Sequence, residues 1–333
     1  MIRILYYIII AMFTFASYNL LGSESKISTK DVIKIDRYDW LQYEFVTTNS
    51  VSALNKMNTE FSQVTKFLIE DVLSLGKVDD NHINRRMKLY LSDSTLMKLM
   101  QDALRDFEDL TPIEKQLNLG FSNLKKEFPD IVIPKVYAQF SALNQSVVIG
   151  DSLLGFSIDK YLGVDYPLYK EFYYDYQTRT MRKDRVASDC LAFYLQGQYP
   201  ISEDFSSNLL DLILYKGKVY WIVSNILEYD SFDKGLGYTE KESKWCHDNK
   251  ERLLETIINR DKLFVDDKLR ANDFINHDSL RILFGNNTPP ALSVWVGTEL
   301  VDRYMKQNEN ISLSELINST DYKKILLNIN HSI

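Results

Sequence analysis

Apolar residues recur at intervals of three and four along most of the chain, which is the spacing of one face of an amphipathic helix. Two early stretches show it, "SALNKMNTEFSQVTKFLIEDVLSLG" and "STLMKLMQDALRDFEDL", and "TPIEKQLNLGFSNLKKEFPD" adds a third. Ser92 or Asp93 is a suitable cap for the second helix, and Thr111 for the third. We therefore predict packed amphipathic helices from about residue 32 to residue 128.

The pattern changes at Ile131. The stretch "IVIPKVYAQFSALNQSVVIGDSLLGFSID" is rich in β-branched and aromatic residues and is broken at Asn144-Gln145 and Gly150-Asp151. Such a pattern is typical of short strands separated by turns. It predicts two or three strands in a meander, inserted between helices.

A dense group of tyrosines follows in "YLGVDYPLYKEFYYDYQ". Aromatic side chains in such a group could stack on a sugar ring or a peptide, or they could fill gaps in a loop-rich interior. The members considered for an aromatic surface are Tyr166, Tyr169, Tyr173, Tyr174 and Tyr176.

Helical spacing returns over residues 184–196 and 206–224, and again after "YTEKE", where Thr239 and Glu242 form a capping box. The stretch "PPALSVWVGTELVDRYMKQ" predicts another helix, and a second capping box from Ser312 to Glu315 begins the last. The predicted fold class is α+β and predominantly helical. Residues 30–130 form its N-terminal helical part and residues 131–333 its sheet and remaining helices, together in one compact domain.

Residues 1–23 are predicted to contain an export signal. Arg3 precedes the uncharged, mostly apolar run "ILYYIIIAMFTFASYNLLGS". This run predicts either a cleaved signal peptide or an uncleaved anchor, with the body of the protein outside the cytoplasm. No cysteine follows the run, so we do not expect a typical lipoprotein.

The charge and the cysteine content exclude two classes of function, nucleic-acid binding and a cysteine-based metal site. The formal net charge is -7 and the basic residues are scattered, so no basic face for nucleic acid is expected. Cys190 and Cys246 are too few for a cysteine-based metal site. They are read as two buried free thiols, with a disulfide as the alternative.

The chain shows no conventional catalytic motif. Its histidines are far apart, so none of them share a helix face as the two histidines of a common zinc protease do. There is no glycine-rich phosphate loop and no G-x-S-x-G elbow. The acidic pairs Glu203-Asp204 and Asp266-Asp267 are interpreted as solvated loop residues. We therefore assign no catalytic residue, no metal ligand and no cofactor.

One helix carries an unusual interruption. "DLILYKGKVYW" is apolar except around Lys216-Gly217-Lys218. A glycine costs a helix interior about 1 kcal/mol relative to alanine. It therefore indicates a close approach of another backbone or a site.

Four ordered blocks between about residues 136 and 317 resemble the gliding-motility lipoprotein B family of Bacteroidetes. The first runs from "VYAQF" to "YPLY", and the others are "LLDLILYKGKVYW", "GLGYTEKESKWCHDNKERLLETI" and "WVGTELVDRYMKQNENISLSELI". The distinctive residues are Gly237-Tyr238-Thr239, Trp245-Cys246 and Trp295-Val296-Gly297.

That family is similar to predicted zinc-dependent proteases in which a two-histidine helix precedes a glutamate-glycine helix. The resemblance implies a zincin-like domain with a degenerate metal site. Asp189, Cys190 and Phe193 would stand at the positions of the first histidine, the catalytic glutamate and the second histidine. Lys216 and Gly217 would stand at the positions of the glutamate-glycine pair. An ion pair between Asp189 and Lys216 is expected instead of catalysis.

The resemblance implies a non-catalytic cell-envelope protein on the periplasmic side. It would act by contacts with a protein of the motility machinery and its associated secretion machinery, with membrane association through the N-terminal segment. The alternative is an envelope hydrolase of peptide or glycan with an unrecognised active site, for which Asp189, Glu203 and Asp204 are the candidates.

Overall fold

The computed structural model describes residues 32–201, 209–258, 284–285, 288–322 and 325–326. The described residues from Ile33 onward form one compact unit. The predicted leader and the acidic pairs Glu203-Asp204 and Asp266-Asp267 lie outside the described residues. Among the residues described, no helix is both long enough and apolar enough to cross a membrane.

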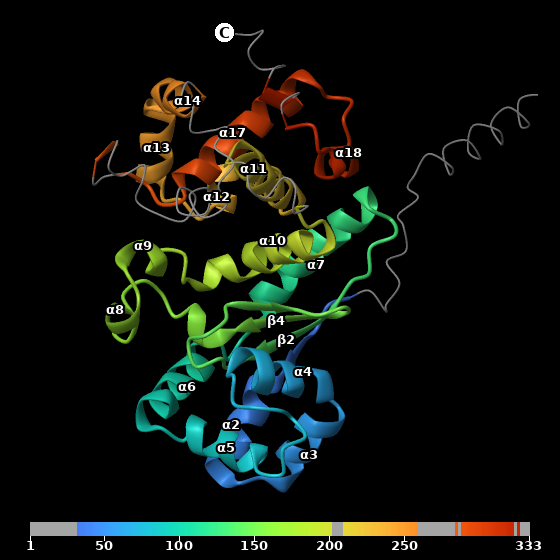
Figure 1. The fold of residues 1–333 in the computed structure, drawn as a ribbon, viewed down its shortest axis with the longest axis vertical. Coiled ribbons are helices and arrows are strands. Elements are labelled where there is room, and N and C mark those ends of the chain that lie inside the picture. The colour runs from blue at the N-terminus through green and yellow to red at the C-terminus, as the bar shows by residue number, and fades with distance from the viewer. Residues whose placement is uncertain (1–31, 202–208, 259–283, 286–287, 323–324, 327–333) are drawn as a thin grey trace, which may run out of the picture. The chain divides into compact units, whose positions relative to one another are not determined.

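Four short strands form a mixed sheet in the order β1-β2-β4-β3 (Figure 1). The strands are β1 (Ile35–Arg37), β2 (Lys135–Gln139), β3 (Val147–Ile149) and β4 (Leu153–Ser157). β1 and β4 run parallel to β2, whereas β3 is antiparallel to β4 at the edge.

The predicted meander is therefore wrong in its order, although its three strands exist. β2 pairs with β4 and with β1, a strand that the sequence pattern missed. Residues 136–139 and 154–157 are buried without interruption, which is typical of central strands covered on both faces. The less buried β3 is left at the edge of the sheet.

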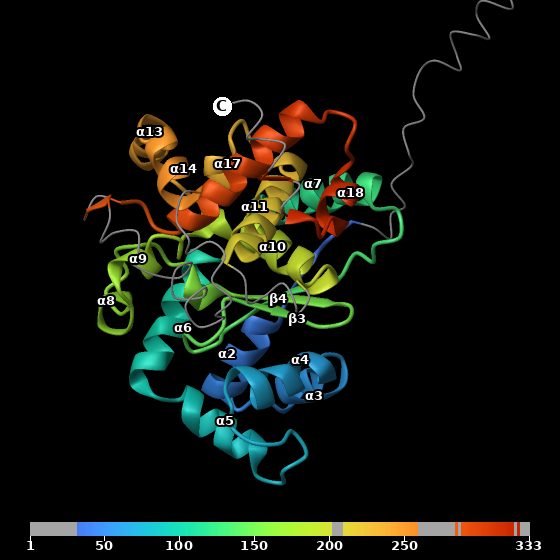
Figure 2. The ribbon, with the colours of Figure 1, turned by 45° about the horizontal axis from the view of Figure 1, so that its top comes forward.

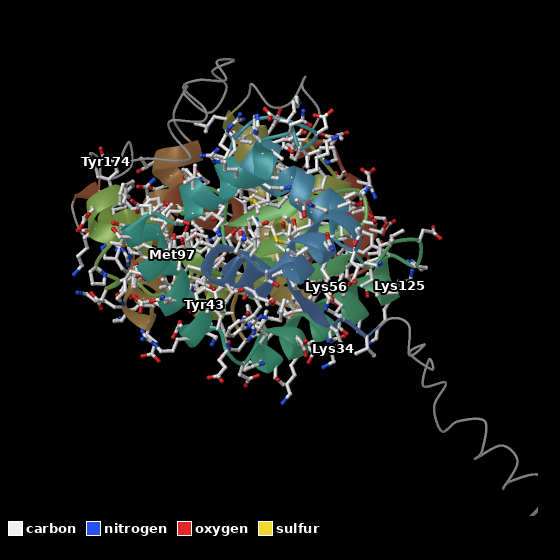
Figure 3. The ribbon with its side chains drawn as sticks, turned by 90° about the horizontal axis from the view of Figure 1, so that it is seen from below. Lys34, Tyr43, Lys56, Met97, Lys125 and Tyr174 are labelled. Atoms are coloured by element: carbon white, nitrogen blue, oxygen red, sulfur yellow. The ribbon has the colours of Figure 1, made fainter. Side chains whose placement is uncertain are left out.

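One side of the sheet is covered by helices from the first part of the chain. These are α2 (Tyr38–Thr48), α3 (Val51–Thr59), α4 (Ser62–Phe67) with a π-helical turn (Leu68–Val72), α5 (Ile83–Leu91) and α6 (Ser94–Asp106). Figure 3 views this layer, with Tyr43 of α2 and Met97 of α6 on it. Asp93 caps α6 as predicted, whereas α7 (Thr111–Glu127) begins at Thr111 itself.

The other side carries α7 and the later helices (Figure 2). They are α8 (Tyr169–Phe172), α9 (Asp175–Thr178), α10 (Val186–Gln198), α11 (Leu209–Ile226), α12 (Phe232–Gly235), α13 (Glu240–Asp248), α14 (Lys250–Ile258), α17 (Leu292–Gln307) and α18 (Leu313–Asn318). Both predicted capping boxes are present, at the starts of α13 and α18. The prediction of a mostly helical α+β fold is confirmed.

Two glycines allow α11 and α17 to cross in backbone contact. A Cβ atom on Gly217 would lie 2.3 Å from the carbonyl carbon of Gly297. A Cβ atom on Gly297 would lie 2.2 Å from the carbonyl oxygen of Ile213. The atoms on the far side are backbone, so they cannot move away as a flexible side chain would. The close approach predicted for Gly217 is confirmed.

Replacing either glycine with alanine should destabilise the protein. We expect Gly217→Ala and Gly297→Ala each to lower the free energy of unfolding by about 1–3 kcal/mol, the usual cost of overpacking. Urea unfolding of the purified chain measures this. Gly197→Ala is the matched control, because its Cβ would meet only the Ile149 side chain, at 3.3 Å. Equal stability of all three variants would contradict the crossing.

Candidate functional site

Asp189 lies in the first turn of α10, where its carboxylate is held by two neighbours. Arg185 Nη2 donates to Asp189 Oδ1 over 2.7 Å, and the Tyr161 hydroxyl donates to Oδ2 over 3.2 Å. Burial raises the pKa of the Asp189 carboxyl, and the Arg185 guanidinium opposes that rise. Asp189 is therefore one half of a buried ion pair with Arg185, the residue immediately before α10.

Arg185 also ties α10 to the segment that contains α12. Its Nη1 donates to the carbonyl oxygens of Gly235 at 2.6 Å and Lys234 at 3.3 Å. Gly237 has a φ of 75° and packs so closely that a Cβ atom there would lie 2.8 Å from Arg185 Cδ. The "GLGYTE" block that supports the family resemblance thus contains the turn that receives this guanidinium.

Lys216 and Phe193 do not converge on Asp189. Lys216 Nζ donates to the Gln196 side-chain oxygen of α10, and burial lowers the pKa of this lysine. Phe193 is 43% exposed. The expected ion pair between Asp189 and Lys216 is therefore wrong, since Arg185, one helical turn before Asp189, is its partner.

The two cysteines are buried free thiols. Burial raises the pKa of both the Cys190 and the Cys246 thiol, so neither is activated as a nucleophile. The preferred interpretation of the cysteines is confirmed, and the disulfide alternative is wrong.

Lys218 is fully buried and joins α11 to the end of α18. Its ammonium donates to the carbonyl oxygens of Ser319 at 2.6 Å and Ile317 at 3.3 Å. It also lies 4.6 Å from the ring centroid of Tyr322, which favours a cation. Burial lowers the pKa of Lys218 to about 8. This lysine satisfies carbonyl groups that the end of α18 leaves without a helical partner.

Asp233 joins α12, α13 and α17. Its Oδ1 accepts from Trp295 Nε1 at 2.6 Å, and its Oδ2 contacts His247 Nε2 at 2.9 Å and the Ser243 hydroxyl. Burial acts to raise the pKa of Asp233, but these hydrogen bonds hold it below its usual value. His247 is thus a hydrogen-bonded histidine.

A pocket of about 190 Å³ lies beyond the carboxyl end of β4. Lys160 projects from the turn after β4, and its Nζ donates to the Tyr173 hydroxyl at 2.6 Å and to the Leu143 carbonyl oxygen at 3.1 Å. The pocket is lined by Ser146, Lys160, Tyr161, Tyr173, Gln177, Thr180, Met181 and Asp189.

The tyrosine group is divided between interior and surface. Tyr169 is fully buried and its hydroxyl donates to the Asp159 carbonyl oxygen at 2.6 Å. The Tyr166 hydroxyl donates to Asp102 at 3.1 Å, and the rings of Tyr166 and Tyr173 pack edge-on against Tyr169. Tyr174 is exposed, at the margin of the view in Figure 3. The Tyr176 side chain is outside the described part of the chain.

Sequence reasoning missed Arg185, Lys160 and Asp233. Arg185 stands immediately before α10 and Asp189 in its first turn, four residues apart, a spacing that predicts an ion pair. Lys160 and Asp233 had no such local indication, because their partners come from distant segments. Within the described residues, no three His, Cys, Asp or Glu side chains are close enough to hold a metal ion.

These observations define a helical α+β protein in which buried charged groups connect the helices beside a small polar pocket. The family model of the gliding motility protein GldB matches residues 22–331. The chain belongs to this family. No curated protein and no solved structure matches it significantly.

Removing Arg185 should leave a buried carboxylate without its cation. We expect Arg185→Met to lower the free energy of unfolding by about 3–5 kcal/mol. The matched control is Arg182→Met, which breaks a more exposed pair with Asp184 and should cost about 1 kcal/mol or less. Thermal and urea unfolding measure both, and equal losses would contradict a special role for the Arg185 pair.

Lys218 should impose a pH dependence on stability. Its pKa is about 8 in the folded protein and 10.5 ordinarily, so the unfolded chain binds more protons between these values. The free energy of unfolding of the wild type relative to Lys218→Met should therefore rise as the pH increases from about 8 to 10. Denaturant titrations across this range measure it, with the exposed Lys66→Met as control. A constant difference would contradict the assignment.

Proposed function

We propose that this chain is a non-catalytic component of the cell envelope that serves gliding motility and the associated secretion machinery by contacts with another protein. Family membership supports the motility role. The further proposal is that the fold is a zincin-like frame whose metal site has been lost. The observation that carries it is that Asp189 and Lys216, at two of the implied metal-binding positions, are engaged with Arg185 and Gln196.

The side chains at those positions do not fit a divalent metal. Lys216 is hydrogen-bonded to Gln196, and a protonated lysine has no lone pair to donate. Phe193 has no ligating atom. Asp189 is paired with Arg185, and Gly217 lies against the backbone of α17. The same side chains support a structural use of this region, and we propose no cofactor for it.

An exposed apolar patch on the helical layer favours protein contacts. Val51 and Leu89 are 69% and 66% exposed. A hydrogen bond of 2.8 Å from Lys88 Nζ to Asn49 Oδ1 joins the two segments on which they lie. Exposed apolar side chains that gather on one face often belong to an interface. We infer that this patch contacts an envelope partner, with residues 1–23 directing or holding the chain there.

An envelope hydrolase of peptide or glycan is the second candidate. Asp189 favours it, because this carboxylate lines a pocket and has a raised pKa, as a general acid requires. It would act as the acid, with the Tyr161 hydroxyl at 3.2 Å as its hydrogen-bonded neighbour.

Two variants separate the candidates in cells that glide. We expect Leu89→Glu to abolish the spreading of the cells and the cross-linking of this chain to its partner. The abundance and melting temperature of the variant should stay normal, because an exposed substitution changes stability by about 0.5 kcal/mol or less. Tyr161→Phe should leave spreading intact. Val132→Glu, at another exposed position, is the control. Normal spreading with Leu89→Glu and loss with Tyr161→Phe would contradict contacts through this patch and favour the hydrolase.

A further inference from the structure

The polar pocket beyond β4 is assembled from four separate parts of the chain. Ser146 precedes the edge strand β3, and Lys160 and Tyr161 follow β4. Thr180 comes from the segment after α9, and Asp189 comes from α10. Figure 1 shows α8 and α9 beside the start of α10. Side chains from distant segments therefore face one small space.

Lys160 gives this space a positively charged wall. Its ammonium donates to the Leu143 carbonyl oxygen and the Tyr173 hydroxyl, which fix its position. Among the described residues it forms no hydrogen-bonded ion pair, because the nearby Asp159 carboxylate accepts from Ser141 and from the backbone of Leu143. Burial lowers the pKa of Lys160, and the nearby Asp159 carboxylate opposes that fall. An anionic group bound beside the ammonium would favour its charged form further.

The rest of the pocket wall offers hydrogen-bond acceptors without a net negative charge. The Asp189 carboxylate is balanced by Arg185, yet its oxygens have lone pairs beyond those used by Arg185 and Tyr161. The Tyr161 hydroxyl donates to Asp189 and so keeps its own lone pairs available. Ser146 and Thr180 add hydroxyl groups to the lining. Such a wall is suited to a ligand's hydroxyl groups.

The size of the pocket limits the ligand. At about 190 Å³ it is smaller than the range of roughly 300–1,000 Å³ that holds drug-sized molecules. A single sugar-sized ring is of suitable size, and a long peptide or a lipid is not.

We propose that this pocket binds a small hydroxylated carboxylate of the size of one uronic acid. The ligand's carboxylate lies against Lys160, and its hydroxyl groups donate to Asp189 and Tyr161. This inference does not rest on the proposed protein contacts, because the pocket and the exposed patch share no residues. The ligand is either a free acid or one unit of an acidic glycan.

Calorimetric titration of the full chain in detergent tests the proposal, with glucuronate, glucose and acetate as the probes. We expect glucuronate to bind with one-to-one stoichiometry. Glucose lacks the carboxylate and acetate lacks the hydroxyl groups, so each should bind at least about tenfold more weakly, the usual effect of losing a charge-assisted hydrogen bond. A glucuronate oligosaccharide then distinguishes a free acid from a unit of a glycan as the ligand. If the oligosaccharide binds more tightly than the monomer, the ligand is the glycan.

Two variants locate the binding. Lys160→Met should weaken glucuronate binding at least about tenfold, and Thr180→Val should weaken it less. The exposed Lys66→Met, which changes a lysine beside a different pocket, should have no effect. Melting curves show which variants are folded, and if Lys160→Met is not, Thr180→Val and the probe comparison still decide. Absence of glucuronate binding, equal binding of glucose, or full binding by folded Lys160→Met would overturn the proposal.

Discussion

The backbone contact between α11 and α17 is the constraint on which the later helices depend. Gly217 and Gly297 remove the side chains that would otherwise separate the two helices. α11 then lies in the interior and packs against α7, α10, α12 and α18 as well. A helix that is apolar around most of its circumference is stable only when it is covered in this way. The burial that the two glycines permit therefore offsets their poor helix propensity.

Charged groups inside this frame connect its helices. Arg185 joins α10 to the segment of α12, Asp233 joins α12 to α13 and α17, and Lys218 joins α11 to the end of α18. Each needs partners, because a buried charge without them is costly. Trp295, which helped to reveal the family resemblance, donates to Asp233 from a fully buried position. The residues that carry the resemblance thus include part of the internal framework of the fold.

The arrangement around Asp189 links the framework to the proposed functions. Its carboxylate is paired with Arg185, and the residue also lines the pocket. The sequence pointed to Asp189 and Gly217 through the resemblance, and Gly217 also through its helix propensity. The sequence could not predict that Lys216 donates a hydrogen bond to Gln196, because this contact depends on how α10 and α11 are aligned against each other. Lys160 was missed for the same reason, since its partners Leu143 and Tyr173 come from other loops.

The sequence by itself determined the mostly helical character, both capping boxes and the existence of β2, β3 and β4. It also determined that Gly217 marks a close approach of another backbone. These features depend on interactions over a few residues, or on the lack of a side chain. Only the tertiary structure decided the order of the strands, because β1 pairs with β2 across about a hundred residues of helix. It also decided the partners of the buried charges and the existence of the pocket. Contacts between distant segments determine them, and hydrophobic periodicity carries no information about which segments meet.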